Sequence, residues 1–139
     1  NLPVADLAAA KAFYEAIGFT NNPQFTDDTA ACMVLTETIH VMLLTHEKFA
    51  QFTPKAIADA KAVSEVLICI SADSREGVDE LTGQALAAGG RETREKQDYG
   101  FMYGRSFEDL DGHIWEPFHM DMASFEAQQA VPEPEPADA

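Results

Sequence analysis

Apolar residues recur at three- and four-residue steps between Leu7 and Ile17, a spacing that predicts an amphipathic helix. Asp6 lies immediately before this run as a suitable N-cap, and Gly18 lies immediately after it as a stop signal. The residues ahead of the helix read as the end of a strand, and three further strand-like runs follow it, at 19–25, 30–35 and 39–44. The pattern therefore predicts one β-α-β-β-β unit.

The same order of elements then begins again. Residues 63–72 are predicted to form a strand, and Asp73 or Ser74 can cap a second amphipathic helix that ends at Gly89 and Gly90. Strand candidates follow at 91–95, 101–107 and 113–120. An internal repeat of this kind predicts an α+β fold, in which two tandem β-α-β-β-β modules form a curved mixed sheet with a cleft.

The length of 139 residues predicts one domain. We expect that domain to span residues 1–122, with modules at 1–45 and 63–122 and a crossover at 46–62. The crossover contains several large apolar residues, so it either packs on the edge of the sheet or covers the cleft as a lid. The remaining segment, residues 123–139, is acidic and rich in proline, and we expect it to be disordered.

Charge and cysteine content narrow the classes of partner. The chain carries 9 Lys and Arg against 24 Asp and Glu, a net charge of −15 that repels phosphate backbones and anionic lipid. We therefore expect neither nucleic acid nor a membrane as a partner, and the longest apolar runs are too short to span a bilayer. Cys32 and Cys69 both lie in apolar stretches, which predicts core thiols of a reduced, cytoplasmic protein.

Three stretches resemble the vicinal oxygen chelate superfamily, which comprises lactoylglutathione lyases, bleomycin and fosfomycin resistance proteins and extradiol dioxygenases. They are VADL and KAFYEAIGF within residues 4–19, ISAD at 70–73, and FEDLDGHIWE at 107–116. The resemblance extends from residue 1 to about residue 121. It implies the cleft fold expected from the repeat, a small-molecule ligand, a homodimer and, in catalytic members, one divalent metal held by side chains from four strands.

The resemblance carries over only part of that metal site. Glu116 matches the last ligand of the family, a glutamate that closes the hairpin motif. The second and third ligand positions fall on Leu43 and Leu67, and the first falls two residues ahead of Asn1. The internal repeat likewise gives Leu43 the place in the first module that Glu116 has in the second. We therefore expect the metal site to be mostly lost, with at most one divalent ion weakly held at Glu116.

Strand alternation suggests a second carboxylate near Glu116. Glu65 shares a strand face with Leu67 and Cys69, and it meets Glu116 if both faces line the cleft. Two such carboxylates would raise one pKa and form a general base or a metal seat. In the other interpretation, Glu65 lies in water at the mouth of the strand.

Aromatic and cationic residues near the last hairpin are the other candidates for ligand contacts, namely Phe101, Tyr103, Arg105 and Phe118. The face of Arg105 depends on the hairpin. If Phe107 pairs with His113, Arg105 points away from the cleft; if Phe107 pairs with Gly112, Arg105 reaches it. The four histidines, at positions 40, 46, 113 and 119, are expected to pack at the surface or between sheets instead of binding metal.

The sequence thus favours a metal-independent protein that binds a small hydrophobic or aromatic molecule in its cleft. The alternative is a lyase or extradiol-type dioxygenase with a divergent metal site in which Glu116 is catalytic. A third hypothesis is a structural or regulatory dimer whose cleft is filled by its own side chains.

Overall fold

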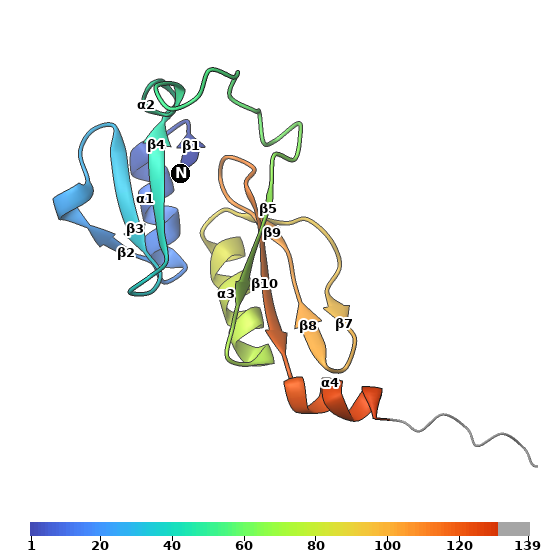
Figure 1. The fold of residues 1–139 in the computed structure, drawn as a ribbon. Coiled ribbons are helices and arrows are strands. Elements are labelled where there is room, and N and C mark those ends of the chain that lie inside the picture. The colour runs from blue at the N-terminus through green and yellow to red at the C-terminus, as the bar shows by residue number, and fades with distance from the viewer. Residues whose placement is uncertain (131–139) are drawn as a thin grey trace, which may run out of the picture.

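A computed structural model describes residues 1–130 of the chain, as two modules that lie side by side (Figure 1). The first module contains β1 (Leu2–Val4), α1 (Leu7–Ala16), β2 (Thr20–Asn22), the short 3-10 helix η1 (Pro23–Phe25), β3 (Ala30–Val34) and β4 (His40–Thr45). A short helix α2 (His46–Ala50) follows. The second module contains β5 (Leu67–Ser71), α3 (Arg75–Ala87), β6 (Arg91–Glu92), β7 (Gln97–Asp98), β8 (Met102–Gly104), β9 (Phe107–Glu108) and β10 (Ile114–Met120), and α4 (Met122–Gln129) follows it.

The two sheets repeat one topology. In the first sheet the order is β1-β4-β3-β2, with β1 parallel to β4. In the second sheet β10 pairs in parallel with β5 on one side and antiparallel with β8 and β9 on the other, while β7 and β6 form the far edge. The short strands β8 and β9 together take the place of β3, and β6 and β7 take the place of β2. The predicted α+β fold of two tandem β-α-β-β-β modules is confirmed.

Local capping explains where the two long helices begin and end. The carboxylate of Asp6 accepts a hydrogen bond from the backbone N–H of Ala9 at 3.0 Å, and the hydroxyl of Ser74 accepts one from the N–H of Gly77 at the same distance. Ser74, and not Asp73, is therefore the second N-cap. Gly18 and Gly89 follow the helices with φ of 101° and 103°, which only glycine adopts readily.

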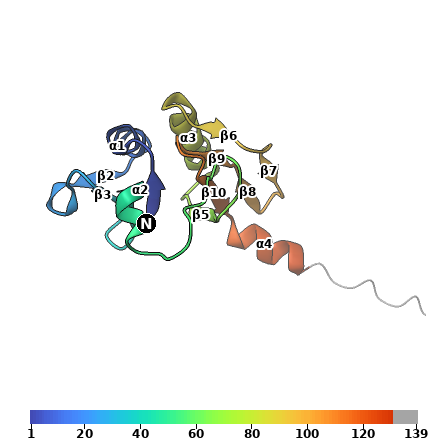
Figure 2. The same ribbon diagram turned by 90° about the horizontal axis from the view of Figure 1, so that it is seen from above.

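The core lies between the helices and the sheets. Helices α1 and α3 are on the same side of the two sheets (Figure 2), and the apolar faces of the strands pack beneath them. Aromatic rings join the modules, because Trp115 of β10 makes edge contacts with Tyr14 and Phe19, each at a centroid distance of 5.9 Å. Residues of both modules are thus buried in one hydrophobic cluster.

The crossover between the two modules differs in length from the prediction. The strand predicted from Val63 begins only at Leu67, so the crossover is longer than expected. It packs on the β9–β10 turn so closely that a Cβ on Gly112 would lie 2.7 Å from the backbone of Ala60.

The disorder predicted for residues 123–139 is wrong for the first part of that segment, because α4 continues to Gln129. Asp121 caps this helix, and the ring of Phe125 packs on Phe101 at a centroid distance of 5.1 Å. Residues 131–139 lie outside the described residues. No helix in the described part of the chain has the length and apolar character needed to cross a membrane.

Candidate functional site

Strand β10 separates two environments on the second sheet. Trp115 faces α3 and is buried in the core, whereas Glu116 points to the opposite side. On that side Glu116 is paired with Cys69 of β5, and Ile114 with Leu67, which is 53% exposed. We call this surface, the side of the second sheet that faces away from α3, the open face.

A cavity of about 380 Å³ lies on the open face. Its lining includes the apolar residues Met102, Phe118 and Met120 and the charged residues Arg94, Arg105 and Glu116. Gly104 also lines the cavity, and because it has no side chain it leaves the space above it free. The remaining lining residues are Cys69, Gln97 and Pro117. An apolar cavity with a few convergent polar groups is the common form of a small-molecule site.

Both carboxylate oxygens of Glu116 accept a hydrogen bond. Oε1 accepts from Nη2 of Arg94 at 2.8 Å, and Oε2 accepts from the thiol of Cys69 at 3.2 Å. The side chain of Glu116 is only 18% exposed, so the ion pair with Arg94 offsets the cost of holding its charge at this depth. The hydrogen bond to Glu116, followed by burial, raises the pKa of the Cys69 thiol.

Comparison with known proteins agrees with this architecture. Residues 1–35 match the bleomycin resistance protein-like N-terminal family. A hypothetical protein from S. aureus shares 30% identity with the chain at a TM-score of 0.73, and the match covers 86% of this chain and 89% of that protein. The chain belongs to the vicinal oxygen chelate superfamily.

Two further solved structures of this superfamily's fold are similar at lower identity. A glyoxalase/bleomycin resistance protein/dioxygenase family enzyme from Burkholderia phytofirmans has 20% identity and a TM-score of 0.71, with 86% of this chain and 94% of that chain covered. A fosfomycin resistance protein from Listeria monocytogenes, in complex with Mn(II) and dihydroxypropylphosphonic acid, has 19% identity and a TM-score of 0.60, with 84% and 82% covered. No curated protein matches the sequence.

The residues of one chain do not fit the metal that catalytic members of the superfamily hold. Within residues 1–130, no group of three or more His, Cys, Asp or Glu side chains is placed to bind an ion. The charge of Glu116 is instead paired with the guanidinium of Arg94. Leu67, at the expected third ligand position, presents a hydrocarbon side chain on the open face.

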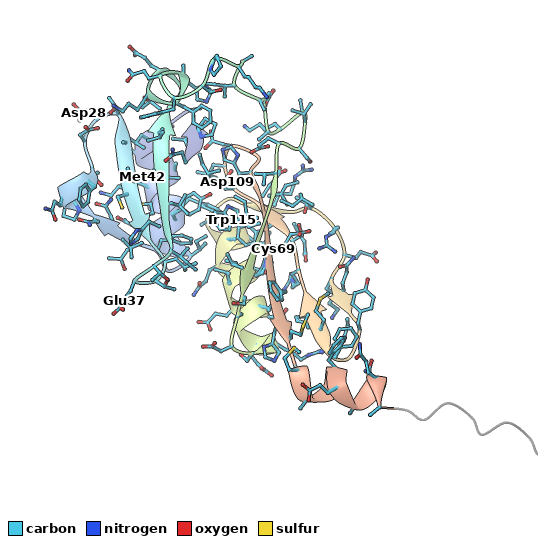
Figure 3. The ribbon with its side chains drawn as sticks, in the orientation of Figure 1. Asp28, Glu37, Met42, Cys69, Asp109 and Trp115 are labelled. Carbon is cyan, nitrogen blue, oxygen red and sulfur yellow. The ribbon has the colours of Figure 1, made fainter. Side chains whose placement is uncertain are left out.

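Leu43 occupies a different place from the one expected. Its side chain is fully buried in the core beneath α1, because it is paired with Leu2, which faces the same core. The equivalence of Leu43 with Glu116 is therefore wrong by one residue, and strand alternation brings Met42 to the other face of β4 (Figure 3). His40 shares the face of Met42 and is exposed, which agrees with the surface position expected for it.

The last hairpin has neither of the two registers considered. Phe107 is paired with Trp115, and Gly104 with Phe118, so the loop spans residues 109–113. This register differs by two residues from the one in which Phe107 pairs with His113, so each side chain keeps the same face. Arg105 and Tyr103 therefore point away from the open face.

The side chains of Arg105 and Tyr103 are engaged on the α3 side of the sheet. The Arg105 guanidinium donates to Glu92 at 3.0 Å and to Asp79 at 3.1 Å, and the Tyr103 hydroxyl donates to Asp79 at 2.6 Å. Their polar groups therefore lie on the α3 side of the sheet, although Arg105 also belongs to the lining of the open-face cavity. That these two residues contact a ligand stays a prediction.

The structure separates Glu65 from Glu116. Glu65 lies ahead of β5 and contacts His113, with Oε1 2.5 Å from Nδ1 of the ring. The other ring nitrogen, Nε2, is 2.7 Å from the carbonyl oxygen of Pro3 in the first module. His113 thus packs between the modules, in agreement with the expected interface role of the histidines.

Two further expectations concern Cys69 and the aromatic candidates. Cys69 was expected in the core, but it is exposed on the open face, whereas Cys32 is buried. Phe118 lines the cavity, and its contact with a ligand stays a prediction. Phe101 instead stacks near Tyr99 at 6.5 Å and contacts Phe125 of α4, outside the cavity lining.

Arg94 is the site residue that the sequence did not reveal. It lies where residues 93–96 of one strand stand opposite only residues 105–106 of the next, so the pairing register shifts by two. This local excess of residues lets the Arg94 side chain reach Glu116. A run of charged residues at 94–96 gives no indication of such a bulge.

Proposed function

We propose that this protein binds a small hydrophobic or aromatic molecule in the open-face cavity without a metal ion. The observation that carries the proposal is the cavity itself, in which Met102 and Phe118 flank a carboxylate already paired with Arg94. An apolar ligand would remove water from these side chains, at roughly 25 cal/mol for each Å² of apolar surface buried. The cavity is of the size that such sites commonly have.

The alternative function, a metal-dependent lyase or dioxygenase centred on Glu116, has less support. The similar protein from Listeria monocytogenes is complexed with Mn(II). In this chain an ion at Glu116 would have to displace Arg94 and gain further ligands from outside the described residues. We therefore assign Glu116 a structural part in the binding site.

The assembly and location follow from the same proposal. Leu67 and Met120 are exposed at the open face, and a second copy of the chain would cover apolar surface there. We propose a homodimer, which sedimentation equilibrium would detect as a doubled mass. We also propose a cytoplasmic location, where Cys32 and Cys69 would remain reduced thiols.

A fluorescence titration tests the binding function. N-phenyl-1-naphthylamine, an uncharged aromatic probe that brightens in apolar surroundings, is added to the protein in excess EDTA. We expect saturable binding that Gly104→Val abolishes, because a side chain at this position projects from the cavity floor beside Phe118. The control is Gly83→Ala in α3, where a Cβ meets no atom within 4 Å.

The outcome distinguishes the two functions. Equal binding of the probe by the wild type and Gly104→Val would show that the probe does not bind in the open-face cavity. Binding that requires added Mn²⁺, together with near-unit metal content by elemental mass spectrometry, would favour the metal-dependent alternative. Circular dichroism of each variant confirms that its fold is retained.

A further inference from the structure

The arginines of the second module differ in how fully their hydrogen-bonding groups are used. Arg105 donates from three nitrogens, to Glu92 and Asp79. Arg75 donates from two nitrogens to Asp98. Arg94 donates one side-chain hydrogen bond within residues 1–130, from Nη2 to Glu116, and its side chain is 35% exposed. A guanidinium has five N–H groups, so most of those on Arg94 have no acceptor in the described part of the chain.

The charged residues of the cavity lining are therefore not equally available to a ligand, and the guanidinium of Arg105 is already bound to Glu92 and Asp79. Glu116 already accepts a hydrogen bond at each oxygen, from Arg94 and from Cys69. Its carboxylate holds the guanidinium in place, and the guanidinium retains donors at the edge of the cavity. Each carboxylate oxygen thus already accepts a hydrogen bond, whereas most N–H groups of the guanidinium have no acceptor among residues 1–130. The groups left for a ligand are therefore mainly the cationic donors of Arg94.

We infer that Arg94 supplies the ligand-binding charge of this cavity, in place of a metal ion, and that the ligand is an aromatic or hydrophobic anion. A carboxylate or sulfonate of the ligand would pair with the guanidinium, a geometry in which arginine forms strong, charge-assisted hydrogen bonds. The apolar body would lie against Met102 and Phe118. Glu116 is a positioning residue in this arrangement. The inference rests on the proposed binding function and specifies its ligand class.

The net charge of the chain opposes the binding of anions. At −15 the protein repels anions in general, so an anion that binds must meet a local cation. A matched pair of probes exploits this. 8-Anilino-1-naphthalenesulfonate and N-phenyl-1-naphthylamine share the same aromatic skeleton, and the sulfonate is present only in the first. Both are titrated into the full chain by fluorescence.

Arg94→Met removes the charge and keeps an apolar side chain of similar reach. We expect this change to weaken the sulfonate probe about tenfold, as the loss of one charge-assisted hydrogen bond would do. The uncharged probe should change by less than about twofold. The control is Arg91→Met, which alters net charge equally but removes an arginine paired with Glu108 outside the cavity lining.

The results separate two claims, that the cavity binds a ligand and that Arg94 binds the anionic group of that ligand. If Arg91→Met weakens the sulfonate probe as much as Arg94→Met does, net charge explains the effect and the inference fails. If Arg94→Met leaves the sulfonate probe unchanged while both probes still bind, the inference fails and the binding function stands. If neither probe binds the wild type, the binding function itself fails. Glu116→Gln adds a readout of positioning, although it also removes a negative charge that repels the sulfonate. Weaker binding of the sulfonate probe in this variant would show that the loss of the Arg94 contact outweighs this gain, and tighter binding would refute the positioning role.

Discussion

The hydroxyl of Tyr14 in α1 donates a hydrogen bond to Oδ2 of Asp109, 2.5 Å away in the turn between β9 and β10. The same hydroxyl accepts a hydrogen bond from Nε1 of Trp115 at 3.0 Å. All three side chains are buried, and Asp109 and Trp115 lie where the two modules meet (Figure 3). A single oxygen atom therefore joins a helix of the first module to a hairpin of the second. Burial and then the charge of Asp109 raise the pKa of Tyr14 well above its usual value.

Tyr14→Phe should destabilise the whole domain because it leaves two buried polar groups without this partner. The expected loss in the free energy of unfolding is about 2 kcal/mol, since the indole N–H and the Asp109 carboxylate both lose a hydrogen bond. Urea denaturation measures it. Tyr99→Phe is the control, because Tyr99 is 56% exposed and its removal should cost less than about 0.5 kcal/mol. Equal losses in the two variants would refute the role of the hydroxyl.

His113 gives the domain a dependence on pH. Both of its ring nitrogens face acceptors, the Pro3 carbonyl and the Glu65 carboxylate, so the ring is fully satisfied only when both nitrogens carry protons. Burial lowers the pKa of His113, but the charge of Asp109 and the bonds to Pro3 and Glu65 outweigh it, and the pKa is raised above 6.5. The ring donates to both acceptors when it is protonated, and it then links Pro3 of the first module to Glu65 ahead of β5.

The direction of the pH effect follows from the raised pKa. The stability that protonated His113 contributes is fully present below the ordinary histidine pKa of about 6.5, and it is lost as the pH rises through the raised folded-state value. We expect the Tm of the wild type to fall across this window more steeply than that of His113→Gln. Differential scanning calorimetry from pH 6 to pH 9 measures the difference, with His40→Gln, at an exposed position, as the control. Parallel curves for all three proteins would contradict the assignment.

Gly90 and Gly83 should respond in opposite directions to alanine. A Cβ on Gly90 would lie 2.7 Å from the carbonyl oxygen of Glu108 and 2.9 Å from that of Ala85, and backbone atoms cannot move aside cheaply. Gly90→Ala should therefore cost about 2 kcal/mol of unfolding free energy. Gly83 lies within α3 with open space around it, so Gly83→Ala should stabilise by about 1 kcal/mol. Chemical denaturation of both variants checks the contrast, which disappears if Gly90 has room after all.

The sequence was sufficient to predict the repeat and the order of elements, because caps and glycine stops are local signals. Asp6 indicates the start of α1 and Gly18 its end, and each acts within a single turn of the helix. The faces of the strands were harder to predict. Residues 41–44 and 66–70 are almost uniformly apolar, so a period of two is hidden and either face reads as the core. Leu43 and Cys69 were each assigned to the wrong side for this reason.

The candidate site depended on register, which a sequence does not state. One residue of slip exchanges the two faces of a strand, and the hairpin loop decided that Arg105 faces α3. Arg94 reaches Glu116 only through the bulge at 93–96, a feature fixed by tertiary pairing. The hairpin motif alone indicates Glu116 as a candidate site residue. Its hydrogen-bond partners, Arg94 and Cys69, are identified only when the bulge and β5 are placed beside β10.

The hydrogen bond between Cys69 and Glu116 predicts the reactivity of the thiol. The carboxylate accepts a hydrogen bond from the thiol at 3.2 Å and raises the pKa of Cys69, so little of the reactive thiolate forms near neutral pH. Glu116→Gln removes this negative charge and leaves Arg94 nearby, and both effects lower the pKa. Alkylation by iodoacetamide, an uncharged reagent, should therefore be several-fold faster in the variant at pH 7.5, as judged by mass spectrometry.

One adduct per native chain is expected, because Cys32 is buried and Cys69 is exposed. Cys69→Ser identifies the alkylated residue, since it should abolish the adduct in both backgrounds. Asp98→Asn is the matched control for charge, because Asp98 is paired with Arg75 and is not a lining residue of the cavity. It should leave the rate unchanged. A rate that rises equally in Asp98→Asn and Glu116→Gln would mean that overall charge governs Cys69, and the local hydrogen bond would lose its explanatory role.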